Sequence, residues 1–100
     1  MIAVIFEVTL KEGMADRYFD LAAELRPELA GVDGFISVER FESRGTPGKF
    51  LSLSFWRDAE ALAAWRDHAG HRQAQELGKA ELFADFRIPV AQVDRDYGPR

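Results

Sequence analysis

The stretch that decides the fold runs from Phe50 to Phe83 and reads FLSLSFWRDAEALAAWRDHAGHRQAQELGKAELF. Its first seven residues alternate between two sets of side chains, which is typical of a strand with two distinct faces. Asp58 then offers a side-chain oxygen to the free amides at the start of a helix. The pair Ala69-Gly70 predicts a break before a second helical segment, which we expect from about residue 71 to 84. Both tryptophans and both histidines of the chain fall between positions 56 and 71, so we expect any pocket chemistry here.

The composition predicts one folded domain that covers residues 1–100, because 47% of the residues are hydrophobic and 30% are charged. A net charge of −4 disfavours general binding of nucleic acid, whose phosphates would be repelled. The absence of cysteine excludes disulfides, a thiol nucleophile and a cysteine-ligated metal. The longest apolar run, from Ile2 to Phe6, is too short to span a bilayer, and no basic segment precedes it as in a signal peptide. We therefore expect a cytoplasmic protein with no membrane partner.

The segments before the central stretch predict a strand, a helix and a second strand. Residues 1–10 (MIAVIFEVTL) are apolar on both faces, which is typical of a strand covered on both sides. Apolar side chains at helical spacing over residues 14–29 predict a helix. This helix is expected to kink or end near Arg26, because Pro27 lacks an amide hydrogen and clashes with the preceding turn. Residues 35–42 (FISVERFE) alternate again and predict the second strand.

Turn residues and a last alternating segment complete the pattern. Residues 44–48 (RGTPG) predict a hairpin that joins the second strand to the third. Residues 86–96 predict the final strand, in which Pro89 indicates a sheet edge or a bulge because it cannot donate to the ladder. The order β-α-β-β-α-β predicts an α+β, ferredoxin-like fold. We expect a four-stranded antiparallel sheet with both helices on one face.

The other face of this sheet poses a packing problem. The first three strands are apolar on both faces, and in the second we expect Ile36 and Val38 on one face and Phe35 and Phe41 on the other. Two helices cover one face only, so the second face must be buried by something else. The simplest candidate is a second copy of the same sheet, and we therefore expect a homodimer.

Three segments resemble a known family, namely GFISVERFES (34–43), LSLSFWRD (51–58) and the run of residues 64–98 that begins AWRDHAGHRQ. They resemble the antibiotic biosynthesis monooxygenase domain family of dimeric α+β barrels, over nearly the whole chain. The resemblance implies one pocket per subunit, between the sheet and the helices. It also implies one of several chemistries, because the family includes cofactor-free oxygenases that convert phenolic polyketides such as anthrones to quinones, quinol oxygenases, and haem-binding or haem-degrading proteins.

Cofactor-free oxygenation requires a base, a group that stabilises an oxyanion and an aromatic slot that excludes water. We expect the base at His68 or His71, because imidazoles titrate near neutral pH. Trp65 would form an aromatic wall, and Arg87 on the last strand would stabilise the oxyanion. The other expected substrate-binding residues share one strand face and are Ser52, Ser54 and Trp56. On this hypothesis the reactants are a phenolic or quinol-type aromatic and O₂, with no metal and no cofactor.

Each of these residues also has a structural interpretation. Trp56 and Trp65 suit packing in the core or a dimer interface, and both histidines suit a helix end. Arg87 equally suits an ion pair with Glu39 or with an acid of the other subunit. A glycine at position 78, within a helix, lowers helix stability by about 1 kcal/mol relative to alanine. A residue with this cost is best explained by close packing that leaves no room for a side chain.

Haem is the alternative ligand. The haem-degrading members carry an asparagine on the first strand, a tryptophan on the second helix and an iron-binding histidine two to three turns later. Trp65 matches the tryptophan, whereas Phe6 or Glu7 stands where the asparagine would fall and His71 lies one turn before the ligand position. The second hypothesis is therefore a haem- or small-ligand-binding dimer without turnover, with His71 as the axial ligand. The third is a scaffold dimer whose pocket is packed shut by Phe and Leu side chains.

Overall fold

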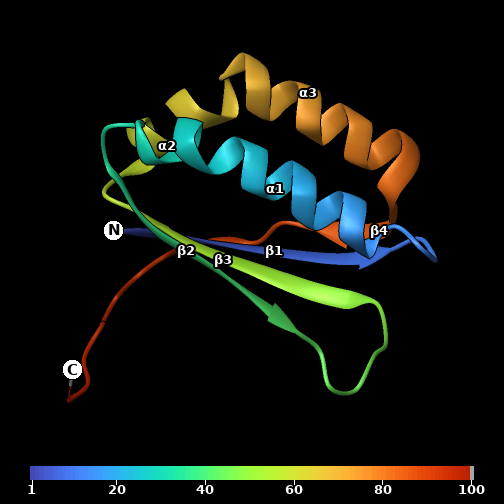
Figure 1. Ribbon diagram of the computed structural model, residues 1–100. Coiled ribbons are helices and arrows are strands. Elements are labelled where there is room, and N and C mark those ends of the chain that lie inside the picture. The colour runs from blue at the N-terminus through green and yellow to red at the C-terminus, as the bar shows by residue number, and fades with distance from the viewer. Residues whose placement is uncertain (100) are drawn as a thin grey trace.

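The computed structural model describes residues 1–99, except for the side chain of residue 69. These residues form two layers, a twisted sheet and a group of helices on one face of it (Figure 1). The strands are β1 (Ile2–Leu10), β2 (Phe35–Glu42), β3 (Lys49–Trp56), β4 (Phe83–Arg87) and β5 (Val90–Gln92). The helices are α1 (Ala15–Ala30), α2 (Ala59–Arg66), α3 (Ala69–Leu77) and the π-helical turn η1 (Gly78–Leu82).

The strand order is β2-β3-β1-β4, with every pair antiparallel and with β5 paired to β1. This order, with the helices on one face, confirms the predicted α+β, ferredoxin-like class. The last strand is split, because β4 pairs with one end of β1 and β5 with the other. Pro89 lies in the gap, where its carbonyl accepts the amide of Ile5 at 2.9 Å. Pairing starts at Phe83, three residues earlier than predicted, and Pro89 produces the expected irregularity at the sheet edge.

Of the two outcomes predicted for Pro27, a kink or an end near Arg26, helix α1 does not show the end. It continues through Pro27 to Ala30, and the amide of Gly31 caps it by donating to the carbonyls of Glu28 and Leu29. Proline removes one helical hydrogen bond near the end of the helix. This loss is offset by packing, because Leu29 is buried in a cluster that includes Trp56.

The break in the second helical region lies one to two residues earlier than predicted. Asp58 caps α2 as expected, and its carboxylate accepts the amide of Ala61 at 2.9 Å. His68 has an extended backbone and caps α3, with Nδ1 accepting the amide of Gly70 at 3.1 Å. Gly70 therefore lies inside the first turn of α3, and the helical region ends at Leu82 rather than residue 84.

Strand β2 contains a bulge that the alternation did not reveal. The register with β3 shifts between Phe35 and Ser37, so Phe35 and Val38 both pack on the helix side. The ring of Phe35 lies 5.3 Å from that of Trp56, centroid to centroid, whereas Ile36 is 52% exposed. The predicted grouping of Ile36 with Val38 is wrong, because one extra residue shifts the alternation.

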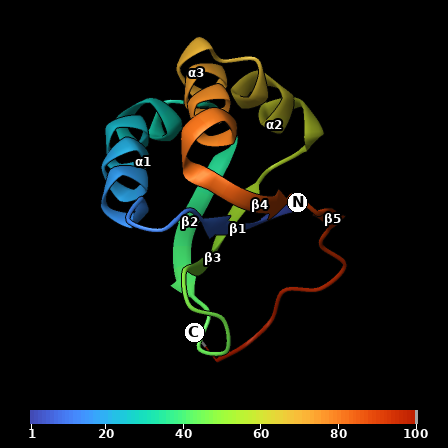
Figure 2. The same cartoon turned by 90° about the vertical axis from the view of Figure 1, so that its right-hand side faces the viewer.

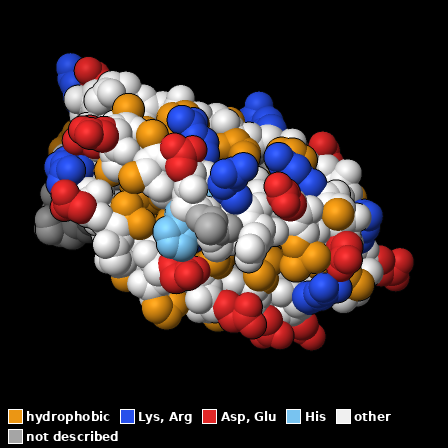
Figure 3. All heavy atoms as spheres, turned by 90° about the horizontal axis from the view of Figure 1, so that it is seen from above, with side chains coloured by type: hydrophobic (Ala, Val, Ile, Leu, Met, Phe, Trp, Pro, Cys, Tyr) orange, Lys and Arg blue, Asp and Glu red, His pale blue; other side chains and the backbone are white. Residues whose placement is uncertain are grey.

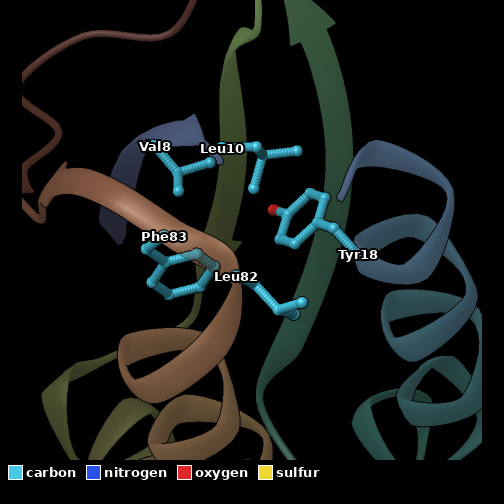
Figure 4. Packing of buried hydrophobic residues seen from close by; sticks show 5 residues of the cluster. All are labelled: Val8, Leu10, Tyr18, Leu82 and Phe83. Carbon is cyan, nitrogen blue, oxygen red and sulfur yellow. The ribbon is translucent and has the colours of Figure 1, made fainter. Parts of the chain in front are cut away.

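Two clusters of buried side chains join the helices to the sheet. The first, shown in Figure 4, consists of Val8, Leu10, Tyr18, Leu82 and Phe83. The second consists of Leu29, Trp56, Ala61 and Trp65. In the first cluster the ring of Tyr18 reaches from α1 toward Phe83. A side chain at Gly78 would collide with the ring of Phe83, which confirms the close packing expected there.

The opposite face of the sheet carries no helix (Figures 1 and 2). Its centre is apolar, because the residues that alternate with the helix-facing ones are Ile5, Leu51, Leu53 and Phe55. Toward β4, Glu7 forms ion pairs with Lys49 and Arg87. After β5 the chain leaves the sheet on this same side (Figure 2). No helix in residues 1–99 is long and apolar enough to cross a bilayer.

Candidate functional site

A cavity of about 580 Å³ lies between the helices and the sheet. Alternate residues of β1 and β3 form its floor, because even-numbered positions of both strands face the helices. Helices α1, α2 and α3 supply its other walls, with members of both buried clusters at the boundary. The scaffold hypothesis required a pocket packed shut, and this open cavity argues against it.

Five of the seven candidate side chains line the cavity, namely Ser52, Ser54, Trp56, Trp65 and His71. Ser52 and Ser54 face the helices because they alternate with the apolar residues of the uncovered face. Trp56 is only 1% exposed, and its Nε1 donates to Oγ of Ser54 at 3.0 Å. Trp56 is therefore both a core residue and part of the cavity wall.

Trp65 lies close to both imidazoles at the junction of α2 and α3. Its ring centroid is 4.9 Å from that of His71 and 5.3 Å from that of His68, and the latter pair is stacked. The indole is 7% exposed and belongs to the second buried cluster. It therefore holds the imidazole of His71 against an apolar surface at the cavity wall.

The environment of His71 favours its neutral form. Burial lowers the pKa of this imidazole below its ordinary value of 6.5. The backbone of Arg66 opposes this shift in pKa, and a positive charge on His68 adds a smaller lowering. Within residues 1–99, Nδ1 is buried without a hydrogen-bond partner, and Nε2 lies 3.5 Å from the side-chain nitrogen of Gln75. A neutral imidazole has one nitrogen that can accept a proton, so His71 has the chemistry of a general base at neutral pH.

His68 and Arg87 lie outside the cavity lining. His68 has a structural position, since its Nδ1 caps α3. Arg87 is on the uncovered sheet face with its side chain 73% exposed, and its guanidinium contacts the carboxylate of Glu7 at 2.6 Å. This contact lowers the pKa of Glu7, with a further contribution from Lys49. Within residues 1–99 Arg87 therefore forms an ion pair with Glu7 and not with Glu39, and its role in catalysis stays a prediction.

The sequence reasoning missed Arg40. This residue lies on β2, faces the cavity and is the cross-strand neighbour of Ser52. Its Nε is buried and has no hydrogen-bond partner within residues 1–99. Val38 and Arg40 alternate regularly after the bulge, so a cation beneath the helices is indicated once Val38 is placed on that side.

A search of residues 1–99 for metal-binding clusters finds no group of three His, Asp or Glu side chains that could hold an ion. The cavity instead offers hydroxyl, imidazole and guanidinium groups within a mainly apolar wall. Such a set suits a small organic molecule with a few polar substituents.

Comparison with known proteins gives consistent matches. A family profile described as antibiotic biosynthesis monooxygenase matches residues 1–77. The jasmonate monooxygenase ABM of Pyricularia oryzae is 47% identical over 93 residues, which make up 93% of this chain and 43% of that protein. The chain thus spans less than half the length of this fungal relative. The YqjZ protein of Bacillus subtilis is 31% identical over 93 residues, which make up 93% of this chain and 79% of that protein.

Solved structures show the same fold at low sequence identity. An antibiotic biosynthesis monooxygenase-like protein from Deinococcus radiodurans superimposes with a TM-score of 0.86 at 18% identity, covering 100% of this chain and 99% of that one. Rv0793 from Mycobacterium tuberculosis gives a TM-score of 0.82 at 18% identity, covering 96% of this chain and 98% of that one. At this identity the similarity extends to the fold alone.

Proposed function

The chain belongs to the antibiotic biosynthesis monooxygenase family, and from this we propose that it oxidises a phenolic or quinol-type aromatic with O₂, without metal or flavin. The observation that carries the proposal is the partly buried imidazole of His71 beside Trp65 at the wall of a 580 Å³ cavity. The cavity walls are mainly apolar, which suits an aromatic ring and limits the entry of water.

The chemistry starts with a proton transfer. His71 removes a proton from a phenolic O–H or from an acidic C–H next to the aromatic system, which leaves an electron-rich anion. This anion gives one electron to O₂, and the resulting radical pair combines to form a C–O bond in a peroxide. Loss of the second hydrogen of that carbon, together with cleavage of the O–O bond, yields a ketone and water. For the methylene carbon of an anthrone the balance is CH₂ + O₂ → C=O + H₂O, in which carbon supplies all four electrons and no other reductant is needed.

The relative from Pyricularia oryzae is named a jasmonate monooxygenase and shares 47% of its residues with this chain over the aligned region. This name makes jasmonate a reasonable member of any substrate panel, next to anthrones and hydroquinones. This chain covers only 43% of that relative. Jasmonate therefore enters the panel as a candidate substrate and not as the assigned one.

The active unit in this proposal is a homodimer in which the uncovered sheet faces meet. Its support is the apolar centre of that face, formed by Ile5, Leu51, Leu53 and Phe55. An apolar sheet face gains free energy when it is removed from water, and a two-fold axis pairs identical surfaces. The helices, which lie on the other face of the sheet, would then be on the outside of the dimer, together with the cavity between them and the sheet.

Oxygen uptake with the substrate panel tests the proposal. We expect uptake with at least one anthrone or hydroquinone, and, from an anthrone, a ketone that carries one oxygen atom from isotopically labelled O₂. His71→Gln should lower kcat by about 100-fold or more, because general-base catalysis contributes that much. His68→Asn removes the other imidazole but keeps a capping acceptor, and we expect it to retain activity.

Two results would overturn the proposal: no turnover with any member of the panel, or full activity of His71→Gln. Activity lost in His68→Asn and kept in His71→Gln would move the base to His68. Titration with haem examines the alternative ligand, since a haem-binding module should show a Soret band that weakens in His71→Gln.

A further inference from the structure

The cavity is cationic, although the protein as a whole is acidic. The chain has 17 acidic and 13 basic residues apart from histidine, for a net charge of −4. The cationic residues of the cavity lining are Arg26, Arg40, Arg66, Arg72 and Lys79. Glu76 is the one carboxylate among the described lining residues. On the helix-covered outer face Lys and Arg are interspersed with Asp and Glu (Figure 3).

Arg40 differs from the other four cations in its burial. The other four are exposed, whereas Arg40 is partly buried on the sheet side of the cavity. Its Nε is fully buried without a hydrogen-bond partner, and no ion pair joins Arg40 to a carboxylate within residues 1–99. A buried donor of a charged group costs free energy when it stays unpaired. An anion that enters the cavity would remove this cost.

The neighbour of Arg40 strengthens the case for a ligand. Ser52 is its cross-strand partner, and both side chains line the cavity. A guanidinium next to a hydroxyl offers several donors on one side of a planar anionic group. His71, in contrast, enters the cavity from α3, on the helix side. The sheet side therefore holds the partly buried donors for an anion, Arg40 and Ser52, and the helix side holds the base.

We propose that the ligand of this cavity carries a carboxylate, which Arg40 and Ser52 bind while the reacting part of the molecule lies toward Trp65 and His71. A carboxylate suits this site because its two oxygens match the fork of a guanidinium, and the rest of the wall is mainly apolar. The exposed cations around the cavity raise the local concentration of such an anion. The inference deepens the proposed function by naming the substrate class, but binding itself requires no turnover.

Binding of a matched pair of ligands tests the inference apart from oxygenation. The probes are 1-hydroxy-2-naphthoate and its methyl ester, which share the phenolic ring system and differ in the anionic group. Calorimetry should show that the wild-type protein binds the acid about tenfold or more tightly than the ester, because a charge-assisted hydrogen bond is lost in the ester. Arg40→Gln should remove this preference by weakening acid binding while leaving ester binding unchanged.

Arg44→Gln is the matched control, because it makes the same change of residue and charge in the hairpin loop, outside the cavity lining. It should leave both affinities unchanged. Arg40→Lys keeps the positive charge and should retain part of the preference for the acid over the ester. This variant provides a second test if Arg40→Gln does not fold. Thermal unfolding of each variant reports folding directly.

Equal affinity of the wild-type protein for acid and ester, or binding of neither, would overturn the inference without any variant. A preference that survives in Arg40→Gln would overturn the role of Arg40. This measurement does not involve oxygen uptake. A failure to oxidise the panel would therefore count against the proposed function, but it would not affect the conclusion on carboxylate binding.

Discussion

The imidazole of His71 lies 4.9 Å from the indole of Trp65, centroid to centroid, at the wall of the cavity. The two residues are six positions apart, which would not bring them together on one straight helix. They meet because the helical region breaks at His68 and restarts as α3. The break thus gives the protein a partly buried imidazole that is held by an aromatic ring and faces a cavity.

We predict that His71 titrates below 6.5, because burial disfavours the charged imidazolium. The chain has two histidines, so proton NMR should show two sets of imidazole signals. The one that disappears in His71→Gln should have its midpoint below 6.5. A midpoint at or above 6.5 for that signal would contradict the burial seen here.

The same shift links stability to pH. The folded-state pKa of His71 is lower than the unfolded-state value, so the unfolded chain takes up the proton first as the pH falls. The free energy of unfolding should therefore decrease as the pH falls through 6.5 and stop changing, for this group, below the folded-state pKa. Urea unfolding on both sides of that pH should show a larger loss in the wild-type protein than in His71→Gln.

His68 should contribute to stability through its cap. His68→Ala removes the acceptor for the amide of Gly70 and should lower the free energy of unfolding by about 1 kcal/mol. His68→Asn supplies another acceptor at the same position and should restore most of that loss. Equal stability of His68→Ala and the wild-type protein in urea would show that the capping bond contributes nothing.

Gly78 should not tolerate a side chain. Gly78→Ala would place its methyl group against the ring of Phe83, which is itself packed among aromatic neighbours, at a cost of about 1–3 kcal/mol. Alanine has a higher helix propensity than glycine, so without close packing Gly78→Ala would increase the free energy of unfolding. Such an increase would contradict close packing at this position. Gly45→Ala is the control, because a Cβ there meets nothing within 4 Å. Thermal unfolding measures both variants.

The uncovered sheet face should mediate self-association. Light scattering coupled to size exclusion should give twice the mass of one chain for the wild-type protein. Leu53→Asp places a charge at the centre of the apolar face and should yield monomers. Ala23→Asp makes a similar change at an exposed position on α1 and should leave the dimer intact. A wild-type monomer at micromolar concentration would end the dimer proposal.

Hydrophobic periodicity predicted most of the fold because it reflects local geometry. The alternation in residues 50–56 and the cap at Asp58 both appear where expected. The errors lie where long-range packing outweighs a local rule. Burial of Leu29 extends α1 past Pro27, and the bulge at Ile36 appears only when β2 pairs with β3.

The residues of the candidate site also divide into those that local alternation predicts and those that long-range packing places. The face of β3 that carries Ser52 and Ser54 was predictable, because a strand alternates its side chains. Arg87 was a reasonable candidate on the last strand, but its register opposite Glu7 places it on the uncovered face. Arg40 shares its face with Val38, and only the pairing of β2 with β3 shows that this face lies beneath the helices.

The sequence by itself determined the element order, the family and the concentration of aromatic and imidazole groups between residues 56 and 71. Only the tertiary structure decided which histidine and which arginine face the cavity. The physical reason is that spacing along one strand or helix sets which residues share a face, whereas strand register, bulges and helix breaks set which faces meet. His71 and Arg40 reach one cavity from elements that meet only in the folded chain.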